Sequence, residues 1–263
     1  AALVYEANGA LLEFLRNRTA RAPIDLRLGC EATATLVEDI RPDVVLVAAG
    51  SLQTRGAGAS MMEEKQGPSV LDGEQLRAML GLAGEGRSRL GRTGRTLAAL
   101  ARLSGLAGRT SWLRSLSRLW MPLGKRVVVL GSDMVGLELA EFLAERGRKV
   151  TILDEGPGPP GAAMSLPRRW RTLATLRKAK VGIYGGVRIG AAHGGGLNYT
   201  GGDGGVQSLR ANHVIDARAA SAGSNPAAEL TASGYDVRTI GDCSGVGYIA
   251  GALADAARAV DDI

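Results

Sequence analysis

The sequence contains little cysteine and no long apolar run. Cys30 and Cys243 are the only cysteines among its 263 residues, and they do not form a CxxC pair. Neither a disulfide scaffold nor a redox-active cysteine pair is therefore expected. No run of about 18 or more apolar residues occurs, and the N-terminus shows no basic-then-apolar signal pattern. These absences predict a soluble, cytoplasmic protein without a membrane span.

Histidine is equally scarce, and the common catalytic motifs are missing. His193 lies in a glycine-rich turn, His213 enters an apolar run, and neither has a partner at metal-ligand spacing. The sequence contains no GxSxG motif, no HExxH motif and no P-loop. We therefore expect no metal site, and no side chain is predicted as a catalytic acid, base or nucleophile.

Acidic residues are almost absent from one segment. Residues 77–126 contain eleven arginines and lysines but only Glu85, whereas the remainder of the chain is slightly acidic and the net charge is +6. Helical apolar spacing at 96–108 and 111–120 predicts two amphipathic helices lying on the body of the protein. Clustered arginine also suits a nucleic-acid backbone, but no nucleic-acid-binding motif accompanies it. Nucleic-acid binding is therefore not expected.

Length and composition set the broad class. Apolar residues make up 45% of the chain, which excludes disorder throughout, and 263 residues suit one large domain or two ordinary ones. The 38 glycines show no collagen-like period and predict turns and loops. The chain begins with Ala1 rather than Met, within what the pattern predicts to be an element, so we expect a fragment or a processed product.

Two periodicities predict the main elements. Continuous apolar runs suit strands buried on both faces of a parallel sheet. These runs occur at 43–50, 126–131, 149–154 and 213–217. Apolar residues at helical spacing predict helices. These helices span 9–20, 132–147, 167–179 and 247–263.

Shorter segments give weaker signals. Alternation at 24–29 predicts a strand, whereas 33–40 fits either a short helix or a strand. Residues 69–80 fit a short helix. The segments 180–186 and 237–243 are predicted as strands, the second of which runs into a turn.

Glycine-rich turns separate three further apolar segments. They predict a small antiparallel meander, with strands at 187–192, 196–200 and 206–211. Residues 51–68 and 155–161 are predicted as loops. The strand–helix–strand alternation around them predicts an α/β fold whose sheets are mostly parallel.

The strongest local signal is a glycine-containing turn between a predicted strand and a predicted helix. Gly131-Ser-Asp-Met-Val-Gly136 matches the Rossmann fingerprint GxGxxG at its first and third glycines. The first permits the tight turn, the third lets the helix pack closely, and the helix N-terminus offers unpaired N–H groups to a pyrophosphate. The pattern predicts dinucleotide binding. An ordinary βαβ unit that needs glycine only for packing is the alternative.

Asp133 stands where the fingerprint has its second glycine. Glycine at this place lets the backbone approach the pyrophosphate, whereas a carboxylate adds repulsion and bulk. The side chain can instead turn outward and cap the helix. Both arrangements are compatible with the sequence.

Asp154 ends the next predicted strand, 23 positions after Gly131. An acid at this place accepts hydrogen bonds from both ribose hydroxyls and repels a 2′-phosphate. It therefore predicts NAD(H) in preference to NADP(H), and no arginine follows it until Arg168. A solvated acid at the end of a strand is the alternative.

Several segments together resemble one family. They are VVVLGSDMVGLELAEFLAERGRKVTILDEG, DVVLVAAG, WMPLGKRVVVLG and TIGDCSGVGYIAGALADAAR. In order and spacing they resemble the FAD/NAD(P)-binding C-terminal region of the group that includes 2,4-dienoyl-CoA reductase, trimethylamine dehydrogenase and NADH:flavin oxidoreductase. The resemblance extends along the whole chain.

The resemblance implies two interleaved lobes with related, Rossmann-like folds. An NAD(P)-binding domain at 124–210 would be inserted into an FAD-binding domain formed by 1–60 and 211–263, with 61–123 as a basic helical linker or insert. The first βαβ unit of the FAD domain would precede Ala1. So would a barrel domain, which in longer relatives carries FMN and a 4Fe-4S cluster.

The resemblance also assigns residues to the cofactors. Ala49 and Gly50 match a conserved crossing strand, and Gly241-Asp242 matches an element whose aspartate contacts the flavin ribityl chain. A helix N-cap is the alternative role for Asp242. The candidate cofactor-binding residues are Gly131, Ser132, Asp133, Met134, Val135, Gly136, Glu138, Asp154, Ala49, Gly50, Gly241 and Asp242.

The implied activity is that of an FAD-dependent, NAD(P)H-linked oxidoreductase. Hydride would pass from the nicotinamide to flavin, and the protein would position the two cofactors. The alternative is a non-catalytic nucleotide-binding module that has lost flavin. Asp133 and the segment 216–221, which lacks the glycine expected there, favour this alternative.

Overall fold

The computed structural model describes most of the chain. The described residues are 7–52, 67–73, 75–76, 121, 123–218, 221–222 and 226–261. Both helices predicted in the basic window 77–126 lie outside the described residues, and so does most of the predicted loop at 51–68.

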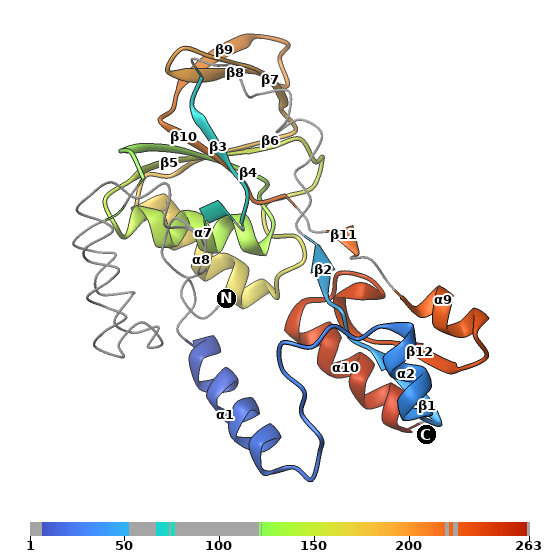
Figure 1. Ribbon diagram of the computed structural model, residues 1–263. Helices are drawn as coiled ribbons and strands as arrows, with labels where there is room; N and C mark the ends of the chain where they lie inside the picture. The colour runs from blue at the N-terminus through green and yellow to red at the C-terminus, as the bar shows by residue number, and fades with distance from the viewer. Residues whose placement is uncertain are drawn as a thin grey trace, which may run out of the picture. The chain divides into compact units, whose positions relative to one another are not determined.

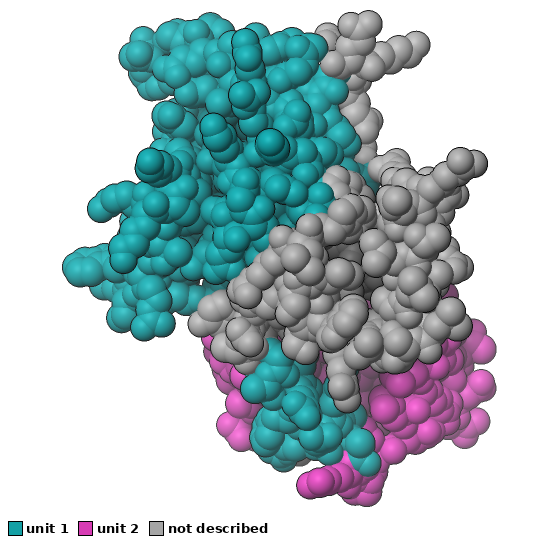
Figure 2. All heavy atoms as spheres, turned by 90° about the vertical axis from the view of Figure 1, so that its left-hand side faces the viewer, with its two compact units in different colours: residues 1–20, 55–218 teal, residues 21–54, 219–263 magenta. Residues whose placement is uncertain are grey.

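The chain folds as two compact units, coloured separately in Figure 2. Unit 1 comprises Ala1–Ala20 and Arg55–Arg218, and unit 2 comprises Arg21–Thr54 and Ala219–Ile263. Most of unit 1 is thus inserted into unit 2 along the sequence. The assignment of cofactors to predicted domains stays a prediction, because the units are defined by contacts alone.

A five-stranded parallel sheet forms the centre of unit 1. Its strands lie in the order β3 (Ser69–Leu71), β10 (His213–Asp216), β4 (Arg126–Leu130), β5 (Lys149–Asp154) and β6 (Gly182–Gly185). The apolar runs of β4, β5 and β10 are buried because the sheet is covered on both faces. The predicted α/β fold with mostly parallel strands is confirmed.

Helices cover one face of this sheet. Figure 1 shows α7 (Met134–Ala144) and α8 (Leu166–Lys178) side by side beneath the strands. Their buried residues Leu137, Leu143 and Leu176 pack with Val129 and Ile152 of the sheet in one hydrophobic cluster. The helical spacing of the two segments therefore reflects burial of a single apolar face.

The antiparallel meander covers the opposite face. Its strands are β7 (Arg188–His193), β8 (Gly196–Thr200) and β9 (Val206–Arg210), as predicted. Leu197 of β8 is fully buried in a second cluster with Leu130 and Leu153 of the parallel sheet. Side chains alternate along a strand, so Val129 and Leu130 face the two different layers.

Unit 2 contains a parallel strand pair and four short or medium helical segments among its described residues. The strands β1 (Val44–Val47) and β12 (Asp236–Thr239) pair along their whole length, although the sequence of unit 1 separates them. Antiparallel β2 and β11 are two residues each. These two strands span Ser51–Leu52 and Ser221–Ala222. The helical segments are α2 (Ala34–Ile40), α9 (Ala227–Ala232), η3 (Gly241–Cys243) and α10 (Tyr248–Asp261).

The strand predicted at 24–29 is wrong. The segment is irregular, and its apolar residues Ile24, Leu26 and Leu28 are exposed, Leu28 to 82%. Alternation alone does not make a strand, because a strand also needs a neighbour that satisfies its backbone groups. Within this segment the Arg27 guanidinium pairs locally, with Asp25.

The structure also shows the outcome of three other predictions, for residues 33–40, 69–80 and 9–20. Residues 33–40 form a helix, α2, because the Thr33 hydroxyl accepts the N–H of Leu36 at its start. The predicted helix at 69–80 begins instead with the strand β3, whose three residues are too few to show a period. The helix predicted at 9–20 is confirmed as α1 (Ala7–Arg21).

The apolar run at 43–50 is a strand but is not buried on both faces. Val47 is buried, whereas Leu46 is exposed. In the described part of the chain β1 pairs with β12 alone, whereas β4 has a paired strand on each side. Among the described residues, no helix combines the length and apolar character needed to cross a membrane.

The buried side of α7 sets the stability of unit 1. We expect Leu143→Ala to lower the free energy of unfolding by about 3 kcal/mol, because Leu143 is fully buried and its truncation leaves a cavity. The matched control is Leu166→Ala on α8, where the side chain is 64% exposed. Urea unfolding followed by circular dichroism measures both, and equal losses would contradict this packing.

Candidate functional site

The turn after β4 is shaped by two glycines. Gly131 has φ +97°, a backbone conformation that favours glycine, and its N–H donates to the carbonyl of Leu153 at 2.8 Å. A Cβ on Gly136 would collide with the carbonyl oxygen of Gly131. The first turn of α7 therefore lies directly against the turn, and only glycine at position 136 permits this approach.

Ser132 is buried, and its N–H, hydroxyl and carbonyl all form hydrogen bonds within the protein. It is 3% exposed, and both its N–H, at 2.8 Å, and its hydroxyl donate to Asp154 Oδ2. Its carbonyl accepts the N–H of Gly161 at 2.7 Å, from the loop after β5. Ser132 thus joins three segments, and its donors are already used within the protein.

Asp154 is the carboxylate at the centre of this arrangement. Its Oδ1 accepts the N–H of Gly156 at 2.8 Å, while Oδ2 takes the two donors of Ser132. Burial would raise the pKa of Asp154, but the hydrogen bonds from Ser132 and Gly156 and the charge of Arg218 outweigh it and lower the pKa. The group is therefore a carboxylate at neutral pH, with lone pairs remaining for a further donor.

Asp133 occupies the N-cap position of α7 without capping it. Its backbone is extended and its side chain makes no capping hydrogen bond. Its Oδ1 is buried and has no hydrogen-bond partner in the structure. Burial first, and then the nearby charge of Asp154, raise the pKa of Asp133. The outward, capping arrangement considered from the sequence is not the one observed.

Of the remaining predicted residues, Met134 and Val135 lie at the start of α7, and Glu138 lies at its contact with α8. Met134 and Val135 form the first turn of α7, where Val135 is exposed and Met134 packs against the core. Backbone N–H groups in a first turn have no partner within the helix. Glu138 lies farther along and pairs with Arg168 of α8, so its side chain connects the two helices.

Glu138 is less acidic than an ordinary glutamate. Burial raises its pKa, and the charge and hydrogen bond of Arg168 lower it, with a net upward shift. Arg168, the first arginine after Asp154 in the sequence, forms an ion pair with Glu138 at the contact between α7 and α8.

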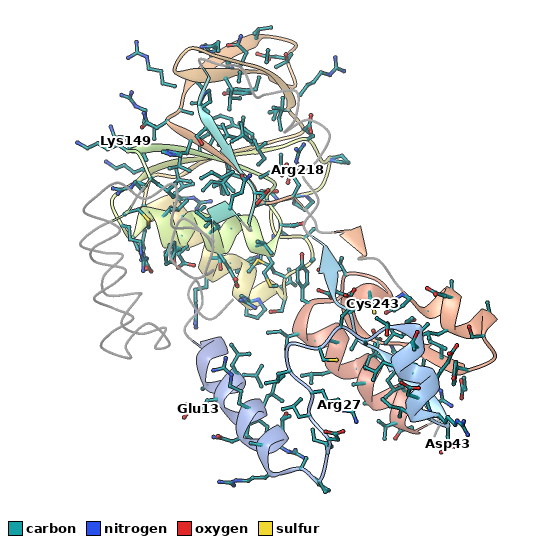
Figure 3. All side chains as sticks on the ribbon, in the orientation of Figure 1. Glu13, Arg27, Asp43, Lys149, Arg218 and Cys243 are labelled. Atoms are coloured by element: carbon teal, nitrogen blue, oxygen red, sulfur yellow. The ribbon has the colours of Figure 1, made fainter. Side chains whose placement is uncertain are left out.

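Sequence reasoning missed a guanidinium at this edge. Arg218, labelled in Figure 3, follows β10 and donates from Nε and Nη2 to Asp216 at 2.9 and 2.7 Å. Its Nη1 donates to Glu155 at 3.1 Å. Its Cα and Cγ lie 3.1–3.2 Å from the place where a Cβ on Gly131 would be. The strands β10 and β5 flank β4 in the sheet, and this order brings Arg218 to Glu155, although 63 positions separate the two residues in the sequence.

These groups gather at β4, on either side of which the strand order of the parallel sheet runs in opposite directions. From β4 the sheet continues through β5 and β6 on one side and through β10 and β3 on the other. The loops that follow β4, β5 and β10 all leave the carboxyl edge. In open parallel sheets this switch point is where ligands bind, and the helix N-terminus beside it suits an anion.

In unit 2, parallel pairing brings two predicted segments to one edge. Val47 of β1 is in register with Thr239 of β12, so Ala49-Gly50 and Gly241-Asp242 both follow the carboxyl ends of adjacent strands. Gly50 has φ +75° and Gly241 has φ +72°. Ala49 is exposed.

Asp242 uses one carboxylate oxygen at the start of α10. Its Oδ1 accepts the N–H groups of Gly247 at 3.0 Å and Tyr248 at 2.9 Å. Asp255, which sequence reasoning missed, accepts the N–H of Gly241 at 3.0 Å through Oδ2. That bond, together with donors from Arg258 and Ser244, lowers the pKa of Asp255 against the effect of burial. A single aspartate in a helix gave no signal of this contact.

Cys243 and the two histidines make internal contacts. The Cys243 thiol, labelled in Figure 3, is buried and donates to the carbonyls of Val47 and Ile240 at 3.1 and 3.2 Å. His213 Nδ1 accepts the N–H of Gly124 at 3.1 Å, and burial lowers the pKa of this ring. His193 Nε2 lies 3.0 Å from the Ser208 hydroxyl. These contacts stabilise strands and turns.

The glycine turn, Asp154 and Gly241-Asp242 all fall within one family match. The sequence pattern of the pyridine nucleotide-disulphide oxidoreductases matches residues 105–243, more than half of the chain. The chain belongs to this family. Its Rossmann-like FAD/NAD(P)-binding fold agrees with the parallel sheet and the small antiparallel sheet.

Individual relatives are longer. An NADH oxidase of Thermoanaerobacter brockii is 26% identical over 242 residues, which are 92% of this chain and 31% of the oxidase. The chain thus spans about a third of the length of this curated relative. Like the family match, this relative is an oxidoreductase.

Two solved structures show the same fold. Histamine dehydrogenase from Rhizobium sp. 4-9 superposes with a TM-score of 0.64 at 16% identity, covering 97% of this chain and 36% of its own. The 6-hydroxypseudooxynicotine amine oxidase of Pseudomonas geniculata N1 gives 0.65 at 20% identity, covering 97% and 34%.

The close approach at Gly136 leads to a stability prediction. Gly136→Ala should lower the free energy of unfolding by about 3 kcal/mol, because the new methyl group meets the backbone of Gly131 rather than a movable side chain. Gly158→Ala is the control, since a Cβ there meets nothing within 4 Å. Urea denaturation compares the two, and a fully stable Gly136→Ala protein would refute the packing.

Asp154 leads to a pH prediction. Asp154→Asn should lower stability at neutral pH by about 1.5 kcal/mol, because charge-assisted hydrogen bonds to the loop are lost. The pKa of Asp154 is lowered by folding, so its contribution is complete above the ordinary aspartate pKa and disappears as pH falls through the lowered value. Urea denaturation across acidic pH measures this, with Glu13→Gln, at an exposed position of α1, as the control. A difference between Asp154→Asn and the unchanged protein that is independent of pH would contradict it.

Proposed function

We propose that the chain is the cofactor-binding part of an FAD-dependent oxidoreductase that passes hydride from a nicotinamide dinucleotide to flavin. One observation carries the proposal for unit 1. The Gly131–Gly136 turn lies at the carboxyl edge of β4 and is joined through Ser132 to the acid that ends β5. When bound, the nicotinamide supplies the hydride and the flavin accepts it.

The residues of the turn have separate tasks in this proposal. The backbone N–H groups of Met134, Val135 and Gly136 would bind the pyrophosphate at the start of α7. Gly131 and Gly136 let the helix approach the strand, and Ser132 and Asp154 hold the loop in place. Glu138 would act indirectly, by fixing α7 against α8 through Arg168.

Asp154 supports NAD(H) in preference to NADP(H). Its carboxylate remains charged and retains lone pairs for the ribose hydroxyls, whereas a 2′-phosphate would meet a like charge. Arg218 is the cation bonded at this edge, and Asp216 and Glu155 already neutralise it. A 2′-phosphate would therefore have to compete with two carboxylates for this guanidinium.

Unit 2 would contribute to the flavin site. Gly50 and Gly241 adopt left-handed backbone conformations at adjacent strand ends, which lets the backbone lie close to a ligand. Asp242 Oδ1 is used at α10, so Oδ2 is the oxygen proposed to accept a ribityl hydroxyl. Ala49 is exposed beside them. The relatives are longer than this chain, and the family resemblance leads us to propose a barrel-type domain upstream, with FMN and a 4Fe-4S cluster.

A second candidate is a nucleotide-binding module without flavin chemistry. The observation that favours it is the use of Asp242 Oδ1 as a cap for α10, a purely structural contact. Titration of the protein with FAD, followed by quenching of flavin fluorescence, separates the two candidates. Binding that is weakened in Asp242→Ala but not in Asp236→Ala supports the flavin role, whereas no binding supports the module.

The dinucleotide assignment is tested by calorimetric titration with NAD⁺ and NADP⁺. We expect NAD⁺ to bind about tenfold more tightly or better, because Asp154 repels the 2′-phosphate. Asp154→Ala should remove most of this preference, and Glu145→Gln, an acid at the far end of α7, should retain it. Tighter binding of NADP⁺, or binding of neither dinucleotide, would overturn the assignment.

A further inference from the structure

The dinucleotide loop has an unusual group at its centre. Asp133 stands between the first and third glycines, and its extended backbone accommodates a side chain without strain. Its Oδ1 is buried with no hydrogen-bond partner in the structure. A carboxylate oxygen that is buried without a hydrogen-bond partner is costly, so this position disfavours the charged form of Asp133 relative to an exposed aspartate.

Among the described residues, other charged groups come from several segments around the turn. They are Glu138 of α7, Asp154 and Glu155 after β5, Arg168 and Arg169 of α8, and Asp216 and Arg218 after β10.

The cations in this set are bonded elsewhere. Arg218 pairs with Asp216 and Glu155, Arg168 pairs with Glu138, and Arg169 donates to the carbonyl of Pro160 at 2.8 Å. Within the described part of the chain, no guanidinium or ammonium group is bonded to Asp133.

Among the described residues around the turn, carboxylates therefore outnumber cations. Of the two aspartates at the loop, Asp154 has a lowered pKa and Asp133 a raised one. As pH falls from neutral, Asp133 is therefore protonated before Asp154. The hydrogen bonds of Ser132 and Gly156 keep Asp154 charged, and this charge assists protonation of Asp133.

We propose that dinucleotide binding at this loop is acid-activated, and that Asp133 takes up one proton when the pyrophosphate binds. As a carboxylate, Asp133 repels the phosphates. With the proton taken from solvent, its hydroxyl donates a hydrogen bond to a phosphate oxygen. This inference rests on the proposed dinucleotide-binding function and adds the regulation of the same site.

The test is calorimetric titration of the full chain with NAD⁺ between about pH 5.5 and 8, where its phosphates stay ionised. Binding linked to one proton strengthens by up to about tenfold for each unit of pH decrease. Asp133→Asn and Asp133→Gly should bind more tightly than the unchanged protein at pH 8 and show little pH dependence. The matched control is Glu145→Gln, which removes one negative charge at the opposite end of α7 and should retain the pH dependence.

Repeating the titration in buffers of different ionisation enthalpy counts the protons directly. We expect net uptake of up to one proton per NAD⁺ with the unchanged protein and none with Asp133→Asn. Equal affinity at all pH values, with no proton uptake, would overturn the role of Asp133 while leaving the dinucleotide site in place. Absence of NAD⁺ binding by every variant, including Asp133→Gly, would instead overturn the proposed function on which it rests.

Discussion

The hydrogen bonds from Ser132 to Asp154 are the contact on which the candidate site of unit 1 depends. They tie the turn after β4 to the end of β5, and the carbonyl of Ser132 adds the following loop through Gly161. The turn is thereby held beside the first turn of α7, where Gly136 lies against Gly131. One carboxylate thus joins the turn after β4 to the loop after β5.

The same edge concentrates negative charge. A carboxylate that anchors a loop is stabilised by donors, but it also repels an anionic ligand, and Asp133 adds to that repulsion. Arg218 offsets part of it, although Asp216 and Glu155 hold its guanidinium. The site thus combines a rigid, well-bonded framework with an electrostatic balance that a single proton changes.

Much of the fold could be predicted because its signals are local. The runs of β4 and β5, the glycine turn and the alternating meander each specify their structure within a few residues. The error at 24–29 has the opposite cause, since a strand requires a partner that alternation does not reveal. Asp133 could be located from the sequence but its buried, uncapped state could not, and Arg218 and Asp255 were missed because their contacts depend on which strands and helices lie side by side.

The pairing of β1 with β12 has a consequence for how the protein is made. Val44 is synthesised before the inserted unit, whereas its partner Asp236 follows that unit. All five strands of the central sheet of unit 1 leave the ribosome before β12 does. The sheet of unit 1 can therefore form during translation before the β1–β12 pair of unit 2 can close.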